Sequence, residues 1–395
     1  MNNSINRKYS FSFFFLHAIT CVVYGYGVYS LKARGYSASL AGECFAICNL
    51  LAFFLQAYLA NVVDNSKKFG VFDVSIICAF IIFVFSIFNT FLFEKSLILT
   101  IVFIIFVTTY ITVEPLINTL YTKFANKGVN IPFSNARAYG SFSYAIFSLI
   151  FGFLTEKYNY NIVLYFFVGF ALCLVIDLLL LNKDYKNLDV KESVSNKTVT
   201  VSYKEFIKHN RSFALLIFFL SLVYLGYLIF DNFMILVVED LGKGSGDLGK
   251  ILGIKAIIET LGIFFVFPYL SKKTKIENIL KIAVIGFFLK AFLSTLATSI
   301  YMLYAIQILQ AFSFALITPG MVSFASKTLN KNEITRGQAL VTMAMVFGSL
   351  FASFLAGNIA DLFGVKTMEI VACLASLLGM MGFISMIKRV NKDAR

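Results

Sequence analysis

The chain has 395 residues, of which 59% are hydrophobic and only 14% are charged, and its mean hydropathy is +0.82. A soluble domain of this length needs more charge on its surface, so the composition excludes a soluble protein and predicts a polytopic membrane protein. The net charge of +13 would suit a nucleic-acid-binding protein, but no RNA- or DNA-reading motif accompanies the basic residues. We therefore expect the chain to sit in a lipid bilayer and to bind no nucleic acid.

Apolar segments of about 20 residues recur along the chain, and each could cross a hydrocarbon core of roughly 30 Å as a helix. The first follows Arg7 and Lys8 and runs on as a full span, so we expect it to be retained and not cleaved as a signal peptide. The predicted spans are residues 11–31, 39–60, 71–93, 97–122, 136–155, 160–181, 212–238, 248–270, 278–298, 302–328, 336–360 and 366–388. The sequence thus predicts an all-α membrane protein with twelve transmembrane helices.

The basic residues predict the orientation of these spans. When the N-terminus is placed in the cytoplasm, most of the 34 lysines and arginines fall in the two tails and the inner loops, and few fall in the outer loops. Such an excess is the usual mark of the cytoplasmic side. We therefore expect a multi-pass protein of the cytoplasmic membrane with both termini in the cytoplasm.

A polar stretch at 182–211, rich in Lys, Ser, Asn and Thr, separates six spans from the other six. We expect an N-terminal six-helix bundle at 1–181, a cytoplasmic linker at 182–211 and a C-terminal six-helix bundle at 212–395.

The two predicted bundles resemble each other in sequence. Pro115 and Lys123 of the fourth span match Pro319 and Lys327 of the tenth, in both cases 204 residues apart. The tripeptide Ser-Lys-Lys also recurs in the loops after the second and eighth spans. Duplicated halves are typical of secondary transporters, which bind solute near mid-membrane. The two prolines could supply kinks for such a transporter or simply bend helices for packing.

Charges inside the spans point to function, because each costs about 2.5 to 3.5 kcal/mol to insert unless it faces a wet cavity or a partner. Glu259 is at the midpoint of the eighth span, and Lys290 is at a similar depth in the ninth. Lys255 precedes Glu259 by one helical turn, so the two could neutralise each other and merely help the helix to insert. Alternatively, Glu259 lines the central cavity as a hydrogen-bond acceptor or as a protonatable carboxylate.

Three more ionisable residues are candidates. Glu114 is near the middle of the fourth span, directly before Pro115, with Asn118 one turn further on. Arg137 opens the fifth span, where it could serve in the cavity or extend to the cytoplasmic surface. Asp231 lies in the seventh span without a cation nearby in the sequence, which favours a functional role.

Enzymatic chemistry and ATP-driven pumping lack support. The only histidines are His17 and His209, and the chain has no HExxH-type, Walker or glycine-rich phosphate-binding motif. We expect no enzyme activity, no metal and no cofactor.

Taken together, the twelve spans, the duplicated halves, the basic middle loop and the Ser-Lys-Lys loops resemble the major facilitator superfamily. Its loop motif G-x-x-x-D-R-x-G-R-K is degenerate here: Asp64 and Lys68 match it, whereas Ala60, Asn65 and Lys67 depart from it. The resemblance implies that superfamily's fold of two six-helix pseudo-repeats.

Within the superfamily, the chain looks most like the lactose-permease type of oligosaccharide:proton symporters and their aromatic-acid and nucleoside relatives. The resemblance implies sugar binding by Arg137, which opens Arg-Ala-Tyr-Gly, and by Glu259, which would also be proton-linked. It implies further roles in proton coupling for Lys290, at the position of a helix 9 arginine, and for Asp231, which follows Phe230 in the helix 7 motif.

Two departures concern the site itself. On helix 10, where the family has a histidine and a glutamate, this chain has Gln310 and Ser313. The family's helix 4 glutamate aligns with Thr119, about a turn and a half from Glu114.

We therefore expect a secondary transporter that moves a small polar, sugar-like solute by alternating access, in symport with protons and as a monomer. An exporter of amphipathic compounds on the same fold is the alternative. The predicted solute contacts are Glu259, Arg137, Glu114, Asn118 and Gln310, and the predicted proton-coupling residues are Glu259, Lys290 and Asp231.

Overall fold

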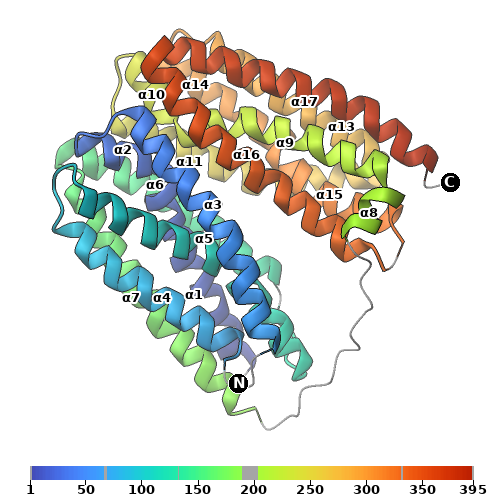
Figure 1. The fold of residues 1–395 in the computed structure, drawn as a ribbon, viewed down its shortest axis with the longest axis horizontal. Coiled ribbons are helices and arrows are strands. Elements are labelled where there is room, and N and C mark those ends of the chain that lie inside the picture. The colour runs from blue at the N-terminus through green and yellow to red at the C-terminus, as the bar shows by residue number, and fades with distance from the viewer. Residues whose placement is uncertain (1, 66–68, 132, 189–202, 331, 394–395) are drawn as a thin grey trace. The chain divides into compact units, whose positions relative to one another are not determined.

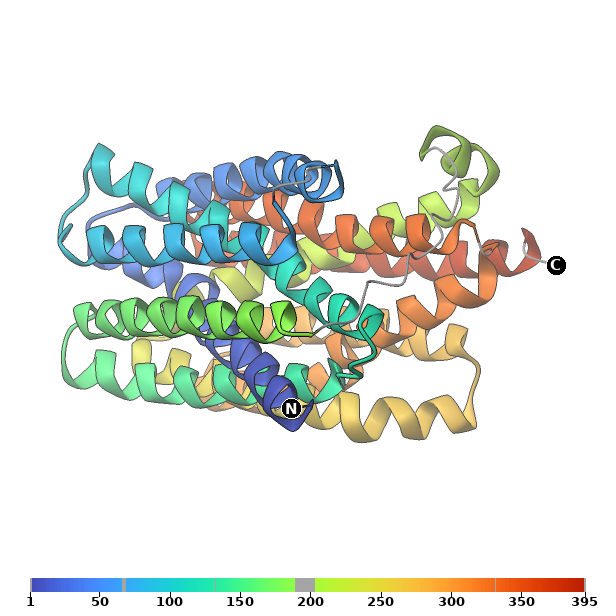
Figure 2. The ribbon, with the colours of Figure 1, turned by 90° about the horizontal axis from the view of Figure 1, so that it is seen from below.

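The computed structural model describes residues 2–65, 69–131, 133–188, 203–330 and 332–393. Within these residues every regular element is a helix, and the chain divides into two compact units, Met1–Asn196 and Lys197–Arg395. Figures 1 and 2 show each unit as a bundle of long helices. Residues 189–202 of the polar stretch lie outside the described part of the chain, and so does the first Ser-Lys-Lys tripeptide at 66–68.

In its described residues, the N-terminal unit contains seven α-helices and one short π-helical segment. α1 packs against α6 and α7, α4 packs against α5 and α7, and α3 packs against α5. The elements are α1 (Asn2–Thr20), η1 (Cys21–Gly25), α2 (Gly27–Ala33), α3 (Ala38–Asn65), α4 (Val71–Thr90), α5 (Leu97–Asn126), α6 (Phe133–Lys157) and α7 (Asn161–Lys186).

The C-terminal unit is built around α9, which packs along α16 and α17, and around α13, which packs on α17 and α15. A 3-10 segment, η3, contacts both α11 and α13. The elements are α8 (Tyr203–His209), α9 (Arg211–Asn232), α10 (Met234–Asp240), α11 (Ser245–Leu261), η2 (Gly262–Val266), α12 (Phe267–Lys273), α13 (Ile276–Thr295), α14 (Ile300–Ile306), η3 (Gln307–Phe312), α15 (Phe314–Thr328), α16 (Ile334–Phe363) and α17 (Val365–Asp393).

Local sequence sets several helix ends. The Ser96 hydroxyl accepts a hydrogen bond from the Leu99 amide at 3.1 Å and so caps the start of α5. Ser299 does the same for the Met302 amide at the start of α14. Gly364 follows α16 with a φ of +85°, a conformation that glycine adopts without strain. α5 and α15 continue through Pro115 and Pro319 as α-helices.

The number of helices that could cross a membrane is close to the predicted twelve. Among the described residues, ten spans are long and apolar enough, and the bent pair Asn3–Gly25 and Gly27–Ala33 makes an eleventh if it is one span. The remaining predicted span, 278–298, falls on α13, a 20-residue helix that carries Glu277, Lys281 and Lys290 and is not among those eleven. The all-helical membrane fold is confirmed, whereas a count of twelve depends on including α13.

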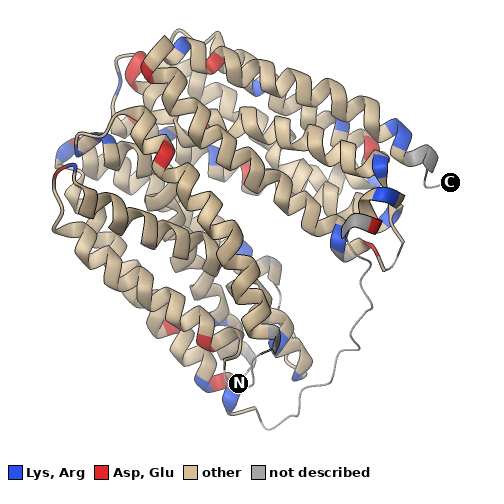
Figure 3. Ribbon diagram, in the orientation of Figure 1, with Lys and Arg blue, Asp and Glu red and all other residues tan. Residues whose placement is uncertain are grey.

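The outer surfaces of the helices are apolar. Large side chains such as Phe54, Phe265 and Leu362 are more than half exposed, as expected for residues that face lipid tails. In both units the charged residues gather near helix ends and in loops, and few lie in the middle of a long helix (Figure 3). Those few interior charges form the candidate site.

Candidate functional site

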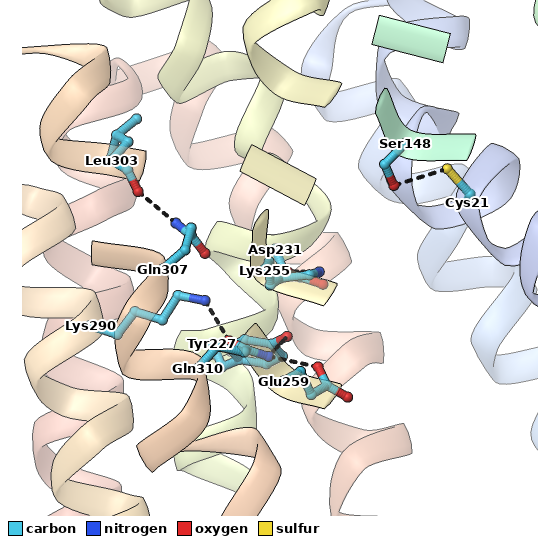
Figure 4. Close-up of polar contacts among 10 residues, drawn as sticks. All are labelled: Cys21, Ser148, Tyr227, Asp231, Lys255, Glu259, Lys290, Leu303, Gln307 and Gln310. Atoms are coloured by element: carbon cyan, nitrogen blue, oxygen red, sulfur yellow. Dashed lines mark hydrogen bonds and ion pairs between the residues drawn. The ribbon is translucent and has the colours of Figure 1, made fainter. Parts of the chain in front are cut away.

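A polar network lies inside the C-terminal unit, and Gln310 is at its centre (Figure 4). The Lys290 ammonium on α13 donates to Gln310 Oε1 at 2.6 Å. Gln310 Nε2 in turn donates to Glu259 Oε2 on α11 at 3.0 Å and to the Tyr227 hydroxyl on α9 at 3.2 Å. Because an amide offers one acceptor and two N–H donors, this side chain connects a cation, a carboxylate and a phenol at once.

An ion pair adjoins this centre. Lys255 Nζ on α11 lies 2.6 Å from Asp231 Oδ1 on α9, with the two side chains 8% and 18% exposed. Asp231 follows Tyr227 by one turn of α9, and its charge acts on the Tyr227 hydroxyl. We call the six residues Tyr227, Asp231, Lys255, Glu259, Lys290 and Gln310 the polar cluster.

The polar cluster is balanced in charge and unevenly buried. Two ammonium groups face two carboxylates, and Lys255 and Lys290 are each only 6% exposed, whereas Asp231 and Glu259 are half-buried. A buried ion is tolerated only when it is paired and hydrogen-bonded, which these lysines are. The more accessible part of the cluster is therefore acidic, and a proton arriving at a carboxylate would leave a net positive charge inside the protein.

The backbone that carries the two glutamines is irregular. Gln307 and Gln310 lie in η3, and side chains three residues apart in a 3-10 helix fall on the same face. Gln307 Nε2 donates to the Leu303 carbonyl at 2.9 Å, and its fully buried Oε1 has no hydrogen-bond partner within the described chain. The 3-10 turn thus directs both amides toward α11 and α13, against which η3 packs.

Two glycines let neighbouring helices approach η3 closely. A Cβ built on Gly286 of α13 would lie 2.5 Å from the Phe312 carbonyl oxygen, and one built on Gly262 would lie 2.8 Å from Ala311 Cα. Real Cβ atoms do not come so close to backbone, so side chains at these positions would push the helices apart. The close contacts hold the polar cluster together from both sides of η3.

A cavity of about 10 Å³ lies beside the polar cluster, between α9 and α13. This volume is about the minimum for one water molecule, and Tyr227, Asp231, Lys290 and Ser294 supply polar groups in its wall. Its remaining lining residues are Phe230, Met234, Phe287 and Ala291.

The N-terminal unit has a smaller group of polar side chains. Glu114 on α5 is half-buried, and its charge interacts with Arg137 on α6, which is exposed. The charge of Glu114 also acts on Tyr24 and Tyr110, whose rings are 6.1 Å apart. One turn after Glu114, the buried Asn118 Oδ1 is without a hydrogen-bond partner in the part of the chain that the structure describes.

The structure brings together the residues predicted for the C-terminal half but changes their pairing. Glu259 and Lys290 are linked through Gln310, which the sequence left as a departure from the family pattern. Lys255, expected as the intrahelical companion of Glu259, forms its ion pair with Asp231. Asp231 has no cation near it in the sequence, and the structure supplies one from another helix, 24 residues further along the chain.

Tyr227 and Gln307 were missed. Tyr227 precedes Asp231 by one turn of α9, and this spacing was the available signal, although abundant tyrosines made it weak. Gln307 lies three residues before Gln310, a spacing that puts two side chains on one helix face, and this was the available signal.

Solved structures of transporters have the same fold. The nucleoside transporter NupG superposes with a TM-score of 0.79 at 17% identity, covering 97% of this chain and 99% of that one. The POT family transporter PepTSo gives 0.73 at 10% identity, with 98% of both chains covered. A bacterial homologue of the human lysosomal transporter Spinster gives 0.68 at 12% identity, with 99% and 98% covered.

Among curated proteins, none matches the chain significantly by sequence. A family model does match: that of the MFS_1 like family covers residues 6–383, which is nearly the whole chain. Together with the all-helical fold and the shared architecture of the transporters above, this match is decisive for the family. The protein therefore belongs to the MFS_1 like family of membrane transporters, within the major facilitator superfamily.

Proposed function

We propose that the protein is a secondary transporter that moves a small polar organic solute by alternating access, in symport with protons. Glu259 is the proposed proton-binding group, and the residues of the polar cluster around it couple its charge to the transport cycle. Glu114, Asn118 and Arg137 are the proposed contacts of the N-terminal unit with the solute, and Gln310 is a contact of the C-terminal unit.

One observation carries this proposal: a charge-balanced cluster in the interior of a membrane protein, with its carboxylates more accessible than its lysines. Such intramembrane charges are costly, so a cluster of four of them favours a functional explanation. When Glu259 is charged, Gln310 donates to it while accepting from Lys290. A protonated, neutral Glu259 would attract the N–H donor of Gln310 less strongly. The orientation of Gln310, and with it the hydrogen bond that Lys290 donates to Gln310, would therefore depend on whether Glu259 carries a proton.

The chemistry of the candidate contacts favours a solute with several hydroxyl or amide groups. Carboxylates and Asn118 Oδ1 accept hydrogen bonds, whereas Arg137 and the Gln310 amide donate them. Sugars and nucleosides present both kinds of group. Because NupG, whose fold this chain shares, is a nucleoside transporter, nucleosides are the first compounds that we would test.

The solute class can be found by a thermal-shift screen of the purified protein with nucleosides, sugars, aromatic acids and cationic drugs. A compound that binds only the folded state stabilises it by RT ln(1 + [L]/Kd), which is about 2.7 kcal/mol at a hundred times its dissociation constant, and so raises the melting temperature. We expect stabilisation by a neutral, hydroxyl-rich compound. Stabilisation by amphipathic cations alone would instead support an exporter.

Proton coupling is tested with Glu259→Gln, which keeps the shape of the side chain and removes its titration. In proteoliposomes, we expect this variant to exchange solute across the membrane at equilibrium but to lose accumulation driven by a proton gradient. Glu239→Gln, at an exposed position near the end of α10, is the control and should accumulate solute normally. Full gradient-driven accumulation by Glu259→Gln would refute the assignment.

A further inference from the structure

Arg34 is a buried cation whose hydrogen-bond donors are only partly used. It follows directly after α2, at the end of the N-terminal unit that is far from the N-terminus (Figure 1). The residue is 5% exposed, and its Nη1 donates to Asn89 Oδ1, near the end of α4, at 2.7 Å. Nε and Nη2 are buried as well, and neither has a hydrogen-bond partner in the described part of the chain. Because a buried donor without a partner destabilises the folded state, this arrangement favours a ligand over a purely structural role.

The two unpartnered donors lie on one edge of the guanidinium group. In this planar group, the N–H of Nε and one N–H of Nη2 point the same way and form a fork. The spacing of the fork matches two oxygens of a carboxylate or a phosphate group, which accept both hydrogen bonds side by side. Asn89 bonds to Nη1 and so holds the plane of the group without using this edge.

The groups that contact Arg34 do not balance its charge. Asn89 is neutral, and the other contact is the ring of Tyr160, whose centre lies 5.6 Å from Arg34 Cζ. Tyr160 is itself 6% exposed and packs edge-on against Tyr29 at 5.6 Å, so its position is fixed. A buried ion is normally paired with an opposite charge. An anion at the unused edge would supply that charge.

A second cation, Lys95, lies close to this end of α2. The Tyr36 hydroxyl donates to the Ser96 carbonyl at 3.0 Å, which holds the turn between α4 and α5 against the residues that follow Arg34. Lys95 Nζ lies 5.9 Å from the centre of the Tyr36 ring, and a Cβ built on Gly35 would lie 3.9 Å from Lys95 Cβ. The exposed Lys95 ammonium therefore adds positive charge near Arg34.

The turn that carries Lys95 has an apolar surface. The large side chains on both sides of Lys95 are more than half exposed, namely Phe91, Phe93, Leu97 and Ile98. Exposed apolar side chains of a membrane protein belong among acyl chains, and a lysine between them lies at the level of the lipid headgroups. The phosphate groups of lipids lie at this level too.

We propose that Arg34 forms an oxyanion site that binds a phosphate group through Nε and Nη2, with Lys95 as a second, exposed cation. The phosphate can belong to a membrane lipid or to free inorganic phosphate, and the apolar surroundings of Lys95 favour the lipid. Because both donors are buried, neighbouring side chains must change rotamer to admit the phosphate, as is common at binding sites. The inference goes beyond the proposed function, since neither the transported solute nor a proton takes part.

The test measures binding to the purified full-length protein, freed of lipid in dodecyl maltoside, a detergent without phosphate. Three probes are titrated separately at constant ionic strength: dioleoylphosphatidylglycerol, dioleoylglycerol, which has the same acyl chains without phosphate, and inorganic phosphate. A probe that binds the folded state raises the melting temperature, and its concentration dependence gives an apparent dissociation constant. We expect dioleoylphosphatidylglycerol to stabilise the wild type and dioleoylglycerol not to. Stabilisation by inorganic phosphate would also support the site and would show that the free anion can occupy it.

Three variants locate the binding. Arg34→Lys keeps the charge and a donor for Asn89 but loses the fork, so we expect its apparent dissociation constant for dioleoylphosphatidylglycerol to rise at least tenfold. Lys95→Gln should raise the same constant about fivefold, as expected for one cation near a lipid surface. Lys157→Gln is the matched control, because it removes an exposed cation from the end of α6, three residues before Tyr160. It should leave the constant unchanged.

Equal affinities of the wild type, Arg34→Lys and Lys95→Gln for dioleoylphosphatidylglycerol would overturn the inference. So would equal stabilisation by dioleoylphosphatidylglycerol and dioleoylglycerol, or no stabilisation by either phosphate-containing probe. The comparison of the three probes needs only the wild type, so it decides the matter even if Arg34→Lys does not fold.

Discussion

The Lys255–Asp231 pair shows that the partner of a charged residue depends on which neighbouring helices its side chain meets. Lys255 and Glu259 are four residues apart on α11, which puts them on one side of the helix and made an intrahelical pair the natural expectation. The Lys255 ammonium instead lies 2.6 Å from Asp231 on α9. Glu259 accepts a hydrogen bond from the Gln310 amide and is half-buried.

At this scale we predict the effect of removing the cation. Lys255→Met leaves the half-buried Asp231 carboxylate without its ion-pair partner, and breaking a buried pair from one side costs about 3 kcal/mol or more. The apparent melting temperature in detergent should fall clearly. Asp231→Asn in the same chain should restore most of the loss, because the orphaned charge is then gone.

The control for this prediction is Lys250→Met. Lys250 pairs with Asp247 three residues before it, but its side chain is 55% exposed, so the pair contributes less than about 1 kcal/mol. Equal losses of stability in Lys250→Met and Lys255→Met would contradict the special burial of the Lys255–Asp231 pair.

Among the secondary-structure elements, η3 decides the geometry of the site. In a regular α-helix the side chains of Gln307 and Gln310 would lie about 60° apart around the axis, and the 3-10 turn brings them into closer alignment. The turn ends at Ser313, whose φ of −119° and ψ of −93° are not helical, and α15 starts directly after it. This irregular segment is accommodated because Gly286 and Gly262 bring α13 and the helix that follows α11 close to its backbone.

We predict that Gly286→Ala disturbs this contact. The new methyl group would meet the Phe312 carbonyl oxygen at 2.5 Å, and backbone cannot move aside as a flexible side chain can. Overpacking of this kind costs about 1 to 3 kcal/mol, and we expect a lower melting temperature together with a weakened proton-driven accumulation.

Gly169→Ala on α7 is the matched control, because a methyl group there would have no neighbour within 4 Å. In an exposed helix this change should be neutral or stabilising by up to about 1 kcal/mol. A Gly286→Ala protein as stable and as active as Gly169→Ala would show that η3 tolerates displacement.

For the whole molecule, hydropathy was enough to predict a helical membrane protein. In lipid, a continuous apolar segment of about 20 residues can hydrogen-bond its backbone N–H and C=O groups within itself only as a helix. It could not predict where the spans are interrupted. The predicted span 212–238 is broken at Phe233 between α9 and α10, and the span 302–328 contains η3. These breaks depend on contacts between helices that are distant in the sequence.

The site was predictable to the extent that it depends on depth in the membrane. Glu259 and Lys290 were expected at one level, and the structure joins them through Gln310. Partner choice was not predictable, because it depends on how each helix is rotated about its own axis. Hydropathy does not report that rotation when lipid-facing and buried positions are both apolar.

Because the chain divides into two compact units, we can predict whether the two halves transport solute when they are expressed as separate chains. We expect residues 1–196 and 197–395, expressed together as separate chains, to restore part of the solute transport of the intact protein in cells, because each unit has its own internal contacts. Neither fragment alone should transport, because the proposed solute contacts are divided between the two units. Uptake by cells that express a single fragment would contradict this arrangement of the site.

The central claim is that solute moves together with protons through Glu259. The most direct measurement adds a solute identified by the thermal-shift screen to lightly buffered proteoliposomes and records the external pH. For the wild type we predict alkalinisation of the medium as solute enters, and for Glu259→Gln we predict no change in pH although solute still equilibrates across the membrane. Solute accumulation by the wild type without any proton movement, or the same alkalinisation in both proteins, would contradict the account.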